Sequence, residues 1–306
     1  MAEYTLEYIN RRAQQDAAAF IAECEQFYHA QIEQVARTVA ENSVSRPIVL
    51  LNGPSSSGKT TSCARLARAL EAHGIHAKTV SMDDYYRTVG TYESPPDPET
   101  GVPDLDSPEC MDLPLLSLHL SQLAAGEEID MPRFDFTTRS WVPHACTLRL
   151  EPDEVVLIEG IHAFNPVIMG DLAHQATGVY LSVESAVRDG ETCIAPEMLR
   201  FLRRAMRDSL FRNSPFEDTL RQWNSVRRGE RLYISPYREQ ADVTVDTLLP
   251  YELCILAAGL AEKLAHHRDV LRAAGLAPLG AVFDRVSPVD YAPYIPENSV
   301  LHEFIG

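Results

Sequence analysis

The sequence predicts an α/β fold in which helices flank a central parallel sheet, and three adjoining segments support this prediction. Residues 47–52 form a short apolar run, as expected for a strand that is buried on both faces of a parallel sheet. Residues 53–61 (GPSSSGKTT) contain the phosphate-loop pattern G-x-x-x-x-G-K-[ST]. Residues 59–73 place apolar side chains at helical spacing. A strand, a glycine-rich loop and a helix in this order are the context in which that pattern binds phosphate.

The residue types of the loop suit the phosphates of a nucleoside triphosphate. Gly53 and Gly58 allow backbone conformations that a side chain would forbid, so the N–H groups of the loop can point at phosphate oxygens. Lys59 supplies a mobile charge for the β- and γ-phosphates, and the Thr60 hydroxyl can hold Mg²⁺. The alternative is a Gly/Ser-rich turn with an incidental lysine. The predicted ATP-binding residues of the loop are Gly53, Pro54, Ser55, Ser56, Ser57, Gly58, Lys59, Thr60 and Thr61.

The composition is that of a large globular chain with an acidic balance. The chain has 306 residues, 45% of them hydrophobic, and a formal net charge of −17, which argues against nucleic-acid or anionic-membrane binding. Its first residues do not resemble a signal peptide, and no apolar run approaches the ~20 residues of a membrane span. The six cysteines occur singly, at no zinc-ligand spacing. We therefore expect a cytoplasmic protein with neither a nucleic-acid nor a membrane partner.

The segment before the phosphate loop is predicted to be helical. Apolar residues recur at helical spacing over residues 4–42, which indicates one or two helices. These helices could form a packing arm or an oligomer contact, and the sequence leaves both interpretations open.

Two acids follow the second predicted strand, at residues 77–81. Ligands of open α/β sheets lie beyond the carboxyl ends of the strands, so Asp83 and Asp84 are expected near the phosphate loop. A carboxylate there can accept a proton from an attacking hydroxyl or hold Mg²⁺ through water. The alternative is an acid that caps a turn or a helix.

A long polar stretch at residues 87–112 comes next, and a loop of this length is usually a functional lid or disordered. A leucine-rich helix is predicted at about residues 113–124. Residues 129–136 and 146–150 are typical of a hairpin, whose aromatic residues could stack on a planar ligand or fill the core. These aromatic residues are Phe134, Phe136 and Trp141.

Residues 153–160 predict a buried strand that ends in an acid, Glu159. This is the Walker B pattern, in which the acid faces Mg²⁺, and the alternative is an ordinary strand with a capping acid. Further strands are predicted at residues 176–182 and 241–246, and a long helix at residues 251–274.

Residues 196–213 predict a helix with an apolar stripe and a basic stripe. Four arginines on one helix face repel one another unless an anion faces them. Guanidinium groups bind phosphate oxygens bidentately, so the segment suits a lid that closes on a triphosphate. The alternative is a solvated basic face. The basic stripe consists of Arg200, Arg203, Arg204 and Arg207.

Taken together, these motifs resemble the uridine kinase and phosphoribulokinase family of P-loop kinases. The matching strings are GPSSSGKTT (53–61), SMDDYY (81–86), PRFDF (132–136), VVLIEGIHAFNP (155–166) and RRAMRD (203–208). The strings WNSVRRGE (223–230) and PENSVLHEFIG (296–306) resemble a bacterial subgroup of nucleoside or uridine kinases.

The resemblance implies a P-loop kinase fold with a β-hairpin in the acceptor site and an arginine-rich helical lid at about residues 196–231. It implies a kinase domain at residues 46–278, preceded by a helical extension (1–45) and followed by a tail (279–306) that packs on it. It also implies ATP and Mg²⁺ as cofactors and a small-molecule nucleoside as substrate, and leaves a homo-oligomer open.

The resemblance further implies a role for each matching position. Asp83 would take the proton from the nucleoside 5′-hydroxyl, with Lys59 and Arg207 assisting catalysis. Thr60, Glu159 and Asp83 would form the Mg²⁺ shell, and Arg207 and Arg212 would contact the triphosphate. The residues implied in nucleoside binding are Tyr86, Asp106, Phe134, Phe136, Arg139 and Arg204.

Two positions depart from the pyrimidine-specific pattern. Phe134 stands where uridine–cytidine kinases use tyrosine, and Arg139 stands where they use a base-reading histidine. Changing the donors of such a site can change the preferred substrate, so a purine nucleoside or another ribose-bearing acceptor stays open. The alternatives to a nucleoside kinase are a kinase of a sugar phosphate or pantothenate, and an ATP-dependent switch without metabolic turnover.

Overall fold

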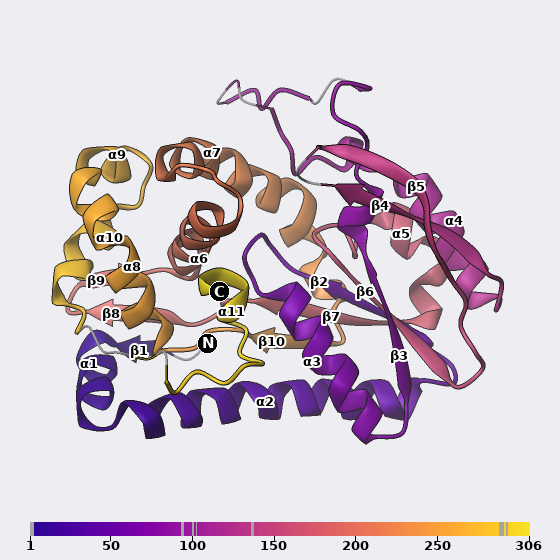
Figure 1. Cartoon of the computed structure of the whole chain (residues 1–306), viewed down its shortest axis with the longest axis horizontal. Coiled ribbons are helices and arrows are strands. Elements are labelled where there is room, and N and C mark those ends of the chain that lie inside the picture. Colours follow the sequence, from indigo (N-terminus) through magenta and orange to yellow (C-terminus); the bar gives the residue numbers. More distant parts are fainter. Residues whose placement is uncertain are drawn as a thin grey trace.

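The computed structural model describes residues 3–92, 95–99, 101, 103–135, 138–287, 291 and 293–306. Its centre is a five-stranded, fully parallel sheet with the strand order β10–β7–β2–β6–β3 (Figure 1). The predicted α/β fold with a parallel sheet flanked by helices is thus confirmed. The strands of this sheet are β2 (Ile48–Asn52), β3 (His76–Ser81), β6 (Glu154–Gly160), β7 (Ala176–Ser182) and β10 (Val243–Asp246).

Alternate residues of the central strands enter two different hydrophobic cores. In β2, Val49 and Leu51 join the core that contains α2 (Ala17–Asn42) and α3 (Lys59–Ala72). Ile48 and Leu50 join the opposite core, which contains α4 (Leu113–Ala124) and α5 (Pro166–Met169). Both faces of β2 are buried, which explains why its sequence is continuously apolar instead of alternating. Each buried aliphatic side chain stabilises the fold by roughly 1.5–3 kcal/mol.

The N-terminal segment forms two helices with separate caps. The Thr5 side chain accepts from the N–H of Tyr8 and starts α1 (Leu6–Gln15). Asp16 ends α1 and its side chain accepts from the N–H of Ala19, which starts α2. α2 runs along the lower edge of the molecule in Figure 1, beside α3.

A small second sheet that the sequence analysis did not predict joins distant parts of the chain. β1 (Glu3–Thr5) pairs in parallel with β8 (Ala186–Asp189), which pairs antiparallel with β9 (Thr192–Ile194). The predicted hairpin is present as β4 (Ile129–Asp135) and β5 (Ser140–Leu148), but its second strand, predicted at residues 146–150, begins already at Ser140.

The remaining helices follow the sequence closely, with one interruption. The predicted helix at residues 251–274 breaks at His267, which has φ −109° and ψ 21°, and so forms α8 (Glu252–His266) and α9 (Arg268–Ala273). The basic segment forms α6 (Pro196–Phe211) and α7 (Phe216–Gly229), and a π-helical turn, η4 (Glu230–Ile234), follows. The other helical elements are η1 (Met82–Tyr85), η2 (Pro108–Cys110), η3 (Gly170–Gln175), η5 (Ser235–Gln240), α10 (Ala277–Val282), η6 (Phe283–Arg285) and α11 (His302–Ile305).

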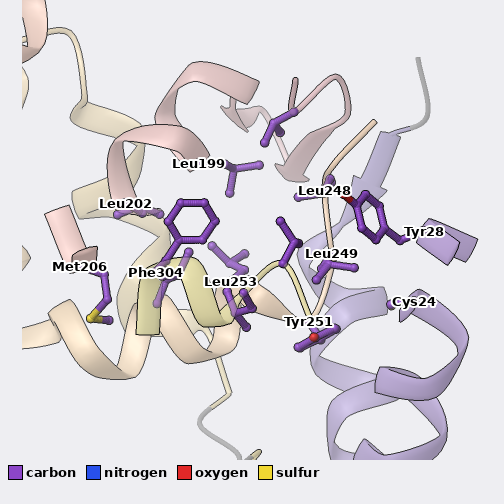
Figure 2. Packing of buried hydrophobic residues seen from close by; sticks show 14 of the residues in the cluster. Cys24, Tyr28, Leu199, Leu202, Met206, Leu248, Leu249, Tyr251, Leu253 and Phe304 are labelled. Atoms are coloured by element: carbon purple, nitrogen blue, oxygen red, sulfur yellow. The ribbon is translucent and has the colours of Figure 1, made fainter. Parts of the chain in front are cut away.

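The last helix packs into the centre of the larger core. Figure 2 shows Phe304 of α11 beside Leu202 of α6 and Leu253 of α8. Tyr251 and Tyr28 continue the same core toward α2. In the part of the chain that the structure describes, no helix has both the length and the apolarity needed to cross a lipid bilayer.

Candidate active site

The phosphate loop connects the end of β2 to the start of α3. Gly58 has φ 85° and Ser56 has φ 59°, so the loop uses left-handed backbone conformations. A Cβ atom at Gly53 would lie 1.9 Å from the carbonyl oxygen of Leu181, and one at Gly58 would lie 2.4 Å from Cγ2 of Val300. The two glycines of the pattern are therefore required by close packing around the loop.

Lys59 folds back over its own loop. Its Nζ donates to the Pro54 carbonyl at 3.0 Å, and the residue is only 8% exposed. Burial lowers the pKa of Lys59, while the negative charges of Glu159, Glu303 and Asp83 oppose this shift. A cation held at the mouth of the loop in this way can reach a phosphate group.

Glu159 ends β6, the strand next to β2, and faces two hydroxyl groups. Its Oε1 accepts from Ser81 Oγ at 2.7 Å and from Thr60 Oγ1 at 3.4 Å. Burial and then the charge of Asp83 raise the pKa of Glu159 to about 7. The oxygen atoms of Glu159 and Thr60 are suitable ligands for Mg²⁺. This ion takes few protein ligands and completes its coordination shell with phosphate oxygens and water. No cluster of three or more His, Cys, Asp or Glu side chains suited to a metal ion occurs among the described residues.

The two acids after β3 have different environments. Asp84 Oδ1 accepts from the N–H of Phe134 at 3.2 Å, so this carboxylate fastens the hairpin to η1. Burial raises the pKa of Asp84. Asp83 is half-buried, and its N–H donates to Ser81 Oγ at 3.4 Å. Of the two acids, Asp83 has the charge that acts on Lys59 and Glu159.

Several residues predicted for the acceptor lie near one another, and the charge of Asp83 acts on two of them, Tyr86 and Asp106. The rings of Tyr86 and Phe134 are 5.7 Å apart and tilted by 53°, and the Tyr86 hydroxyl donates to the Leu105 carbonyl at 3.4 Å. Burial raises the pKa of Asp106 to about 6; the charge of Arg204 opposes the shift, and Asp104 and Asp83 add to it.

Arg139, a further predicted acceptor residue, directly precedes β5 of the hairpin. Arg139 has φ 53° and an exposed side chain, and its carbonyl accepts from the N–H of Val89 at 3.1 Å. Phe136, also predicted to bind the acceptor, lies outside the described residues.

Three arginines of α6 contact the phosphate loop itself. Arg200 Nη1 donates to the Ser55 carbonyl at 3.2 Å, and Arg204 Nη1 donates to Ser55 Oγ at 2.8 Å. Arg203 Nη1 donates to the Ser56 carbonyl at 3.4 Å. Three of the four arginines of the basic stripe therefore lie against the loop.

Carboxylates of the chain itself neutralise two arginines of the basic stripe. The sequence analysis considered only a triphosphate or solvent as the partner of these arginines. Arg200 is 2.6 Å from Glu230, and Arg203 is 2.7 Å from Glu252. The sequence analysis missed these pairs because both acids lie far along the chain from α6.

Asp208 lies within ion-pair distance of three arginines in the C-terminal half of α6 and just after it. Its carboxylate lies 3.3 Å from Arg204, 2.8 Å from Arg207 and 3.8 Å from Arg212. Asp208 is buried, whereas the Arg212 side chain is 47% exposed. A buried acid that holds several guanidinium groups together prepares a cationic surface for an anionic ligand.

The C-terminal tail contacts the start of α3; the sequence analysis implies a tail that packs on the kinase domain but does not identify this contact. Oε2 of Glu303 accepts from the Thr61 N–H at 3.3 Å and from Thr61 Oγ1 at 3.1 Å. Arg65 Nη1 donates to the Asn298 carbonyl at 3.4 Å. Residues 296–306 resemble the bacterial kinase subgroup, but they carry no residue pattern that indicates this contact.

Comparisons with known proteins agree with this geometry. A family model described as "Phosphoribulokinase / Uridine kinase family" matches residues 48–252. A protein named uridine kinase from Borreliella burgdorferi is 29% identical over 199 residues, which cover 65% of this chain and 85% of that protein. A protein named uridine kinase from Deinococcus deserti is 30% identical over 202 residues, which cover 65% of this chain and 87% of that protein.

Among solved structures, a candidate fructose transport system kinase from Silicibacter sp. TM1040 resembles the chain with a TM-score of 0.51 and 23% identity. The match covers 70% of this chain and 98% of the other. At this identity the likeness concerns the fold alone.

Proposed function

The chain belongs to the phosphoribulokinase and uridine kinase family, and from this premise we propose that it transfers the γ-phosphoryl group of ATP to the 5′-hydroxyl of a ribonucleoside. Membership of the family makes the chain a P-loop kinase that phosphorylates a small substrate. The relatives named uridine kinase favour a nucleoside as that substrate, at about 30% identity.

The proposal is supported above all by Asp83, because its charge acts on both halves of the site. Beside the phosphate loop, burial and then Asp83 raise the pKa of Glu159. On the acceptor side, burial and then Asp83 raise the pKa of Tyr86. A carboxylate whose charge reaches both the phosphate-loop residues and the acceptor residues is suited to accept the proton of an attacking hydroxyl.

The residues of the phosphate loop suit ATP, and the family implies ATP and usually Mg²⁺. The loop N–H groups, Lys59, Arg207 and Arg212 would hold the triphosphate, and Thr60, Glu159 and Asp83 would hold the metal. Bound Mg²⁺ would neutralise charge on the β- and γ-phosphates. Little covalent chemistry is asked of the protein, so positioning and electrostatic stabilisation carry the reaction.

The acceptor side suits a ring and a pair of hydroxyl groups. Tyr86 is half-buried and can offer an aromatic face, with the buried Phe134 ring 5.7 Å from it. The carboxylate of Asp106 can accept from ribose hydroxyls, and the guanidinium of Arg204 can donate to them. Phe134 and Arg139 are the residues that we expect to select the base, together with Phe136.

The experiment is ADP release from ATP and Mg²⁺ in the presence of uridine, cytidine, adenosine, guanosine or inosine, with ribulose 5-phosphate and pantothenate alongside. We expect strong turnover with at least one nucleoside. The Lys59→Ala variant, which removes the loop cation, is the matched control for contaminating kinases.

The other outcomes point to different functions. Turnover with a non-nucleoside acceptor alone would contradict the nucleoside assignment and retain the kinase. Tight ATP binding without turnover of any acceptor would favour a nucleotide-dependent switch.

A further inference from the structure

The acceptor segment, which we define as residues 103–110, contains a buried carboxylate whose counter-charge comes from the lid. Asp104 is 2% exposed, although it lies in a long polar stretch. A buried carboxylate is costly unless an opposite charge or hydrogen bonds compensate it. The segment is therefore docked against another part of the molecule at this residue.

The partner is the end of α7 together with η4. Arg228 Nη1 donates to Asp104 Oδ2 at 3.1 Å, and the Tyr233 hydroxyl donates to the same oxygen at 3.1 Å. Arg228 Nε also lies 3.8 Å from the buried carboxylate of Asp97. One guanidinium thus faces two buried acids of the stretch that leads to the acceptor side chains.

The same elements hold Asp106, two residues further along. A Cβ atom at Gly229 would lie 2.9 Å from the Asp106 Cβ, so α7 approaches Asp106 as closely as a glycine permits. On the other side, His162 Nε2 donates to the Asp106 carbonyl at 2.9 Å. His162 is fully buried, and its ring lies 6.1 Å from the Tyr233 ring. The backbone and Cβ of Asp106 are thereby held between α7 and the residues that follow β6.

We propose that Arg228 is a positioning residue for the acceptor: by docking Asp104 onto α7, it holds the Asp106 carboxylate where it can accept hydrogen bonds from an acceptor's vicinal hydroxyl groups. The inference rests on the proposed function, because it assigns a ribose-like diol to the same site. Arg228 itself does not touch the acceptor. Its loss acts through the placement of Asp106 and leaves the phosphate loop in place.

The competing explanation is that Arg228 only neutralises buried charge and so stabilises the fold. The two explanations differ in a kinetic readout. A purely structural role lowers the fraction of active enzyme, which lowers the apparent kcat and leaves the KM for each substrate unchanged. A positioning role raises the KM for the nucleoside and leaves the KM for ATP unchanged.

The experiment compares Arg228→Gln, Asp104→Asn and the double variant with Arg221→Gln. Arg221 is the matched control, because it lies on the same helix, pairs with Asp218 and is exposed to solvent. We expect Arg228→Gln to raise the nucleoside KM about tenfold, as for the loss of about one charge-assisted hydrogen bond. The ATP KM should change less than about twofold, and Asp104→Asn should add little to Arg228→Gln in the double variant.

A charge-neutral variant separates geometry from electrostatics. Gly229→Ala introduces a methyl group that must displace Asp106, so we expect it to raise the nucleoside KM while every charge is kept. Tyr233→Phe removes one donor to Asp104 and should act in the same direction more weakly. If Arg228→Gln does not fold, Gly229→Ala and Tyr233→Phe still test the positioning role through the nucleoside KM.

Two results would overturn the inference. If the unaltered protein phosphorylates nucleosides but Gly229→Ala and Arg228→Gln both leave the nucleoside KM within about twofold, the positioning role fails and the nucleoside kinase stands. If the unaltered protein turns over no nucleoside, the proposed function fails and this inference fails with it.

Discussion

Arg203 of α6 and Glu252 of α8 form an ion pair in which neither side chain has any exposed surface. Arg203 Nη2 lies 2.7 Å from Glu252 Oε2, and Arg203 Nε is 3.1 Å from each carboxylate oxygen. The same guanidinium donates to the Thr247 carbonyl at 2.6 Å and to the Ser56 carbonyl of the phosphate loop. Burial raises the pKa of Glu252, and Arg203 opposes this shift. The lid helix, the phosphate loop and α8 are therefore tied by one buried cation.

Removing this cation should destabilise the fold strongly. Arg203→Ala leaves Glu252 buried without a counter-charge, so we expect the free energy of unfolding to fall by about 3–5 kcal/mol. Urea unfolding followed by circular dichroism measures this. Arg221→Ala, which removes an exposed pair, should change the free energy of unfolding by less than about 0.5 kcal/mol. A similar small change in both variants would contradict the importance of the buried pair.

Asp83 is expected to be needed for turnover and not for nucleotide binding. Asp83→Asn removes the proposed proton acceptor, so we expect kcat to fall by about 10²–10⁴-fold or beyond detection. The ATP dissociation constant, measured by calorimetry without Mg²⁺, should change little, because Asp83 is proposed to contact the metal and not the nucleotide. Asp84→Asn is the neighbouring control, because this acid bonds the hairpin backbone and lies outside the proposed proton transfer. Near-normal turnover in Asp83→Asn would remove Asp83 from the mechanism.

Gly53 should tolerate no side chain. In Gly53→Ala the new Cβ would meet the Leu181 carbonyl, a backbone atom that cannot rotate away. We expect ATP binding to be lost, because the loop must move out of its conformation. Gly74→Ala is the control: Gly74 also has positive φ (77°), but a Cβ atom there would have no neighbour within 4 Å. In that variant we expect a cost of about 1–2 kcal/mol in unfolding free energy and unchanged ATP affinity. Retained ATP binding in Gly53→Ala would show that the loop relaxes more easily than its packing indicates.

The buried imidazole of His162 should make stability depend on pH. Burial lowers the pKa of His162 from 6.5 to about 4. Between these two pH values the unfolded chain binds a proton that the folded chain does not, so stability falls as the pH falls through this window. Above pH 6.5 this contribution is fully present. The shift corresponds to about 3 kcal/mol between pH 6.5 and pH 4. Urea unfolding at pH 7, 6, 5 and 4 should show a steeper loss in the unaltered protein than in His162→Gln. Parallel pH profiles would contradict the buried, neutral histidine.

The Glu303 carboxylate should weaken ATP binding. It accepts from the Thr61 N–H in the first turn of α3, where the helix dipole favours negative charge and where phosphates are expected. Because the carboxylate and the phosphates are like charges that repel one another, we expect Glu303→Gln to lower the ATP dissociation constant about two- to fivefold, measured by calorimetry. Glu297→Gln, at an exposed tail position, should have no effect. Weaker ATP binding in Glu303→Gln would show that Glu303 belongs to the nucleotide site.

The sequence predicted the elements whose signal is local. The phosphate loop, the strand that ends in Glu159 and each single strand of the hairpin are encoded within about ten consecutive residues, and the structure has a loop or a strand at or near those places. The roles assigned to their side chains, and the division at residues 1–45, 46–278 and 279–306, stay predictions.

What the sequence could not predict depends on partners far along the chain. In the sequence, Arg203 is one of four similar arginines of the lid, and only the structure shows that Glu252 lies beside it. β1 and β8 are too short to show a period of two, and their pairing joins opposite parts of the sequence. Glu303 lies in a tail whose composition indicates no chemistry, and its role follows only from its contact with Thr61.

The pairing of Glu3 with Ala186 also has a consequence for biosynthesis. During translation, β1 leaves the ribosome long before β8 exists. Part of the apolar face of α2 is covered even later, because it packs against β10, which includes Val245, and against Tyr251. Although α3 can cover part of α2 early, the rest of this face remains without its native partners until most of the chain has been made. A nascent chain that stalls before β10 exposes this apolar face to chaperones, proteases and other nascent chains.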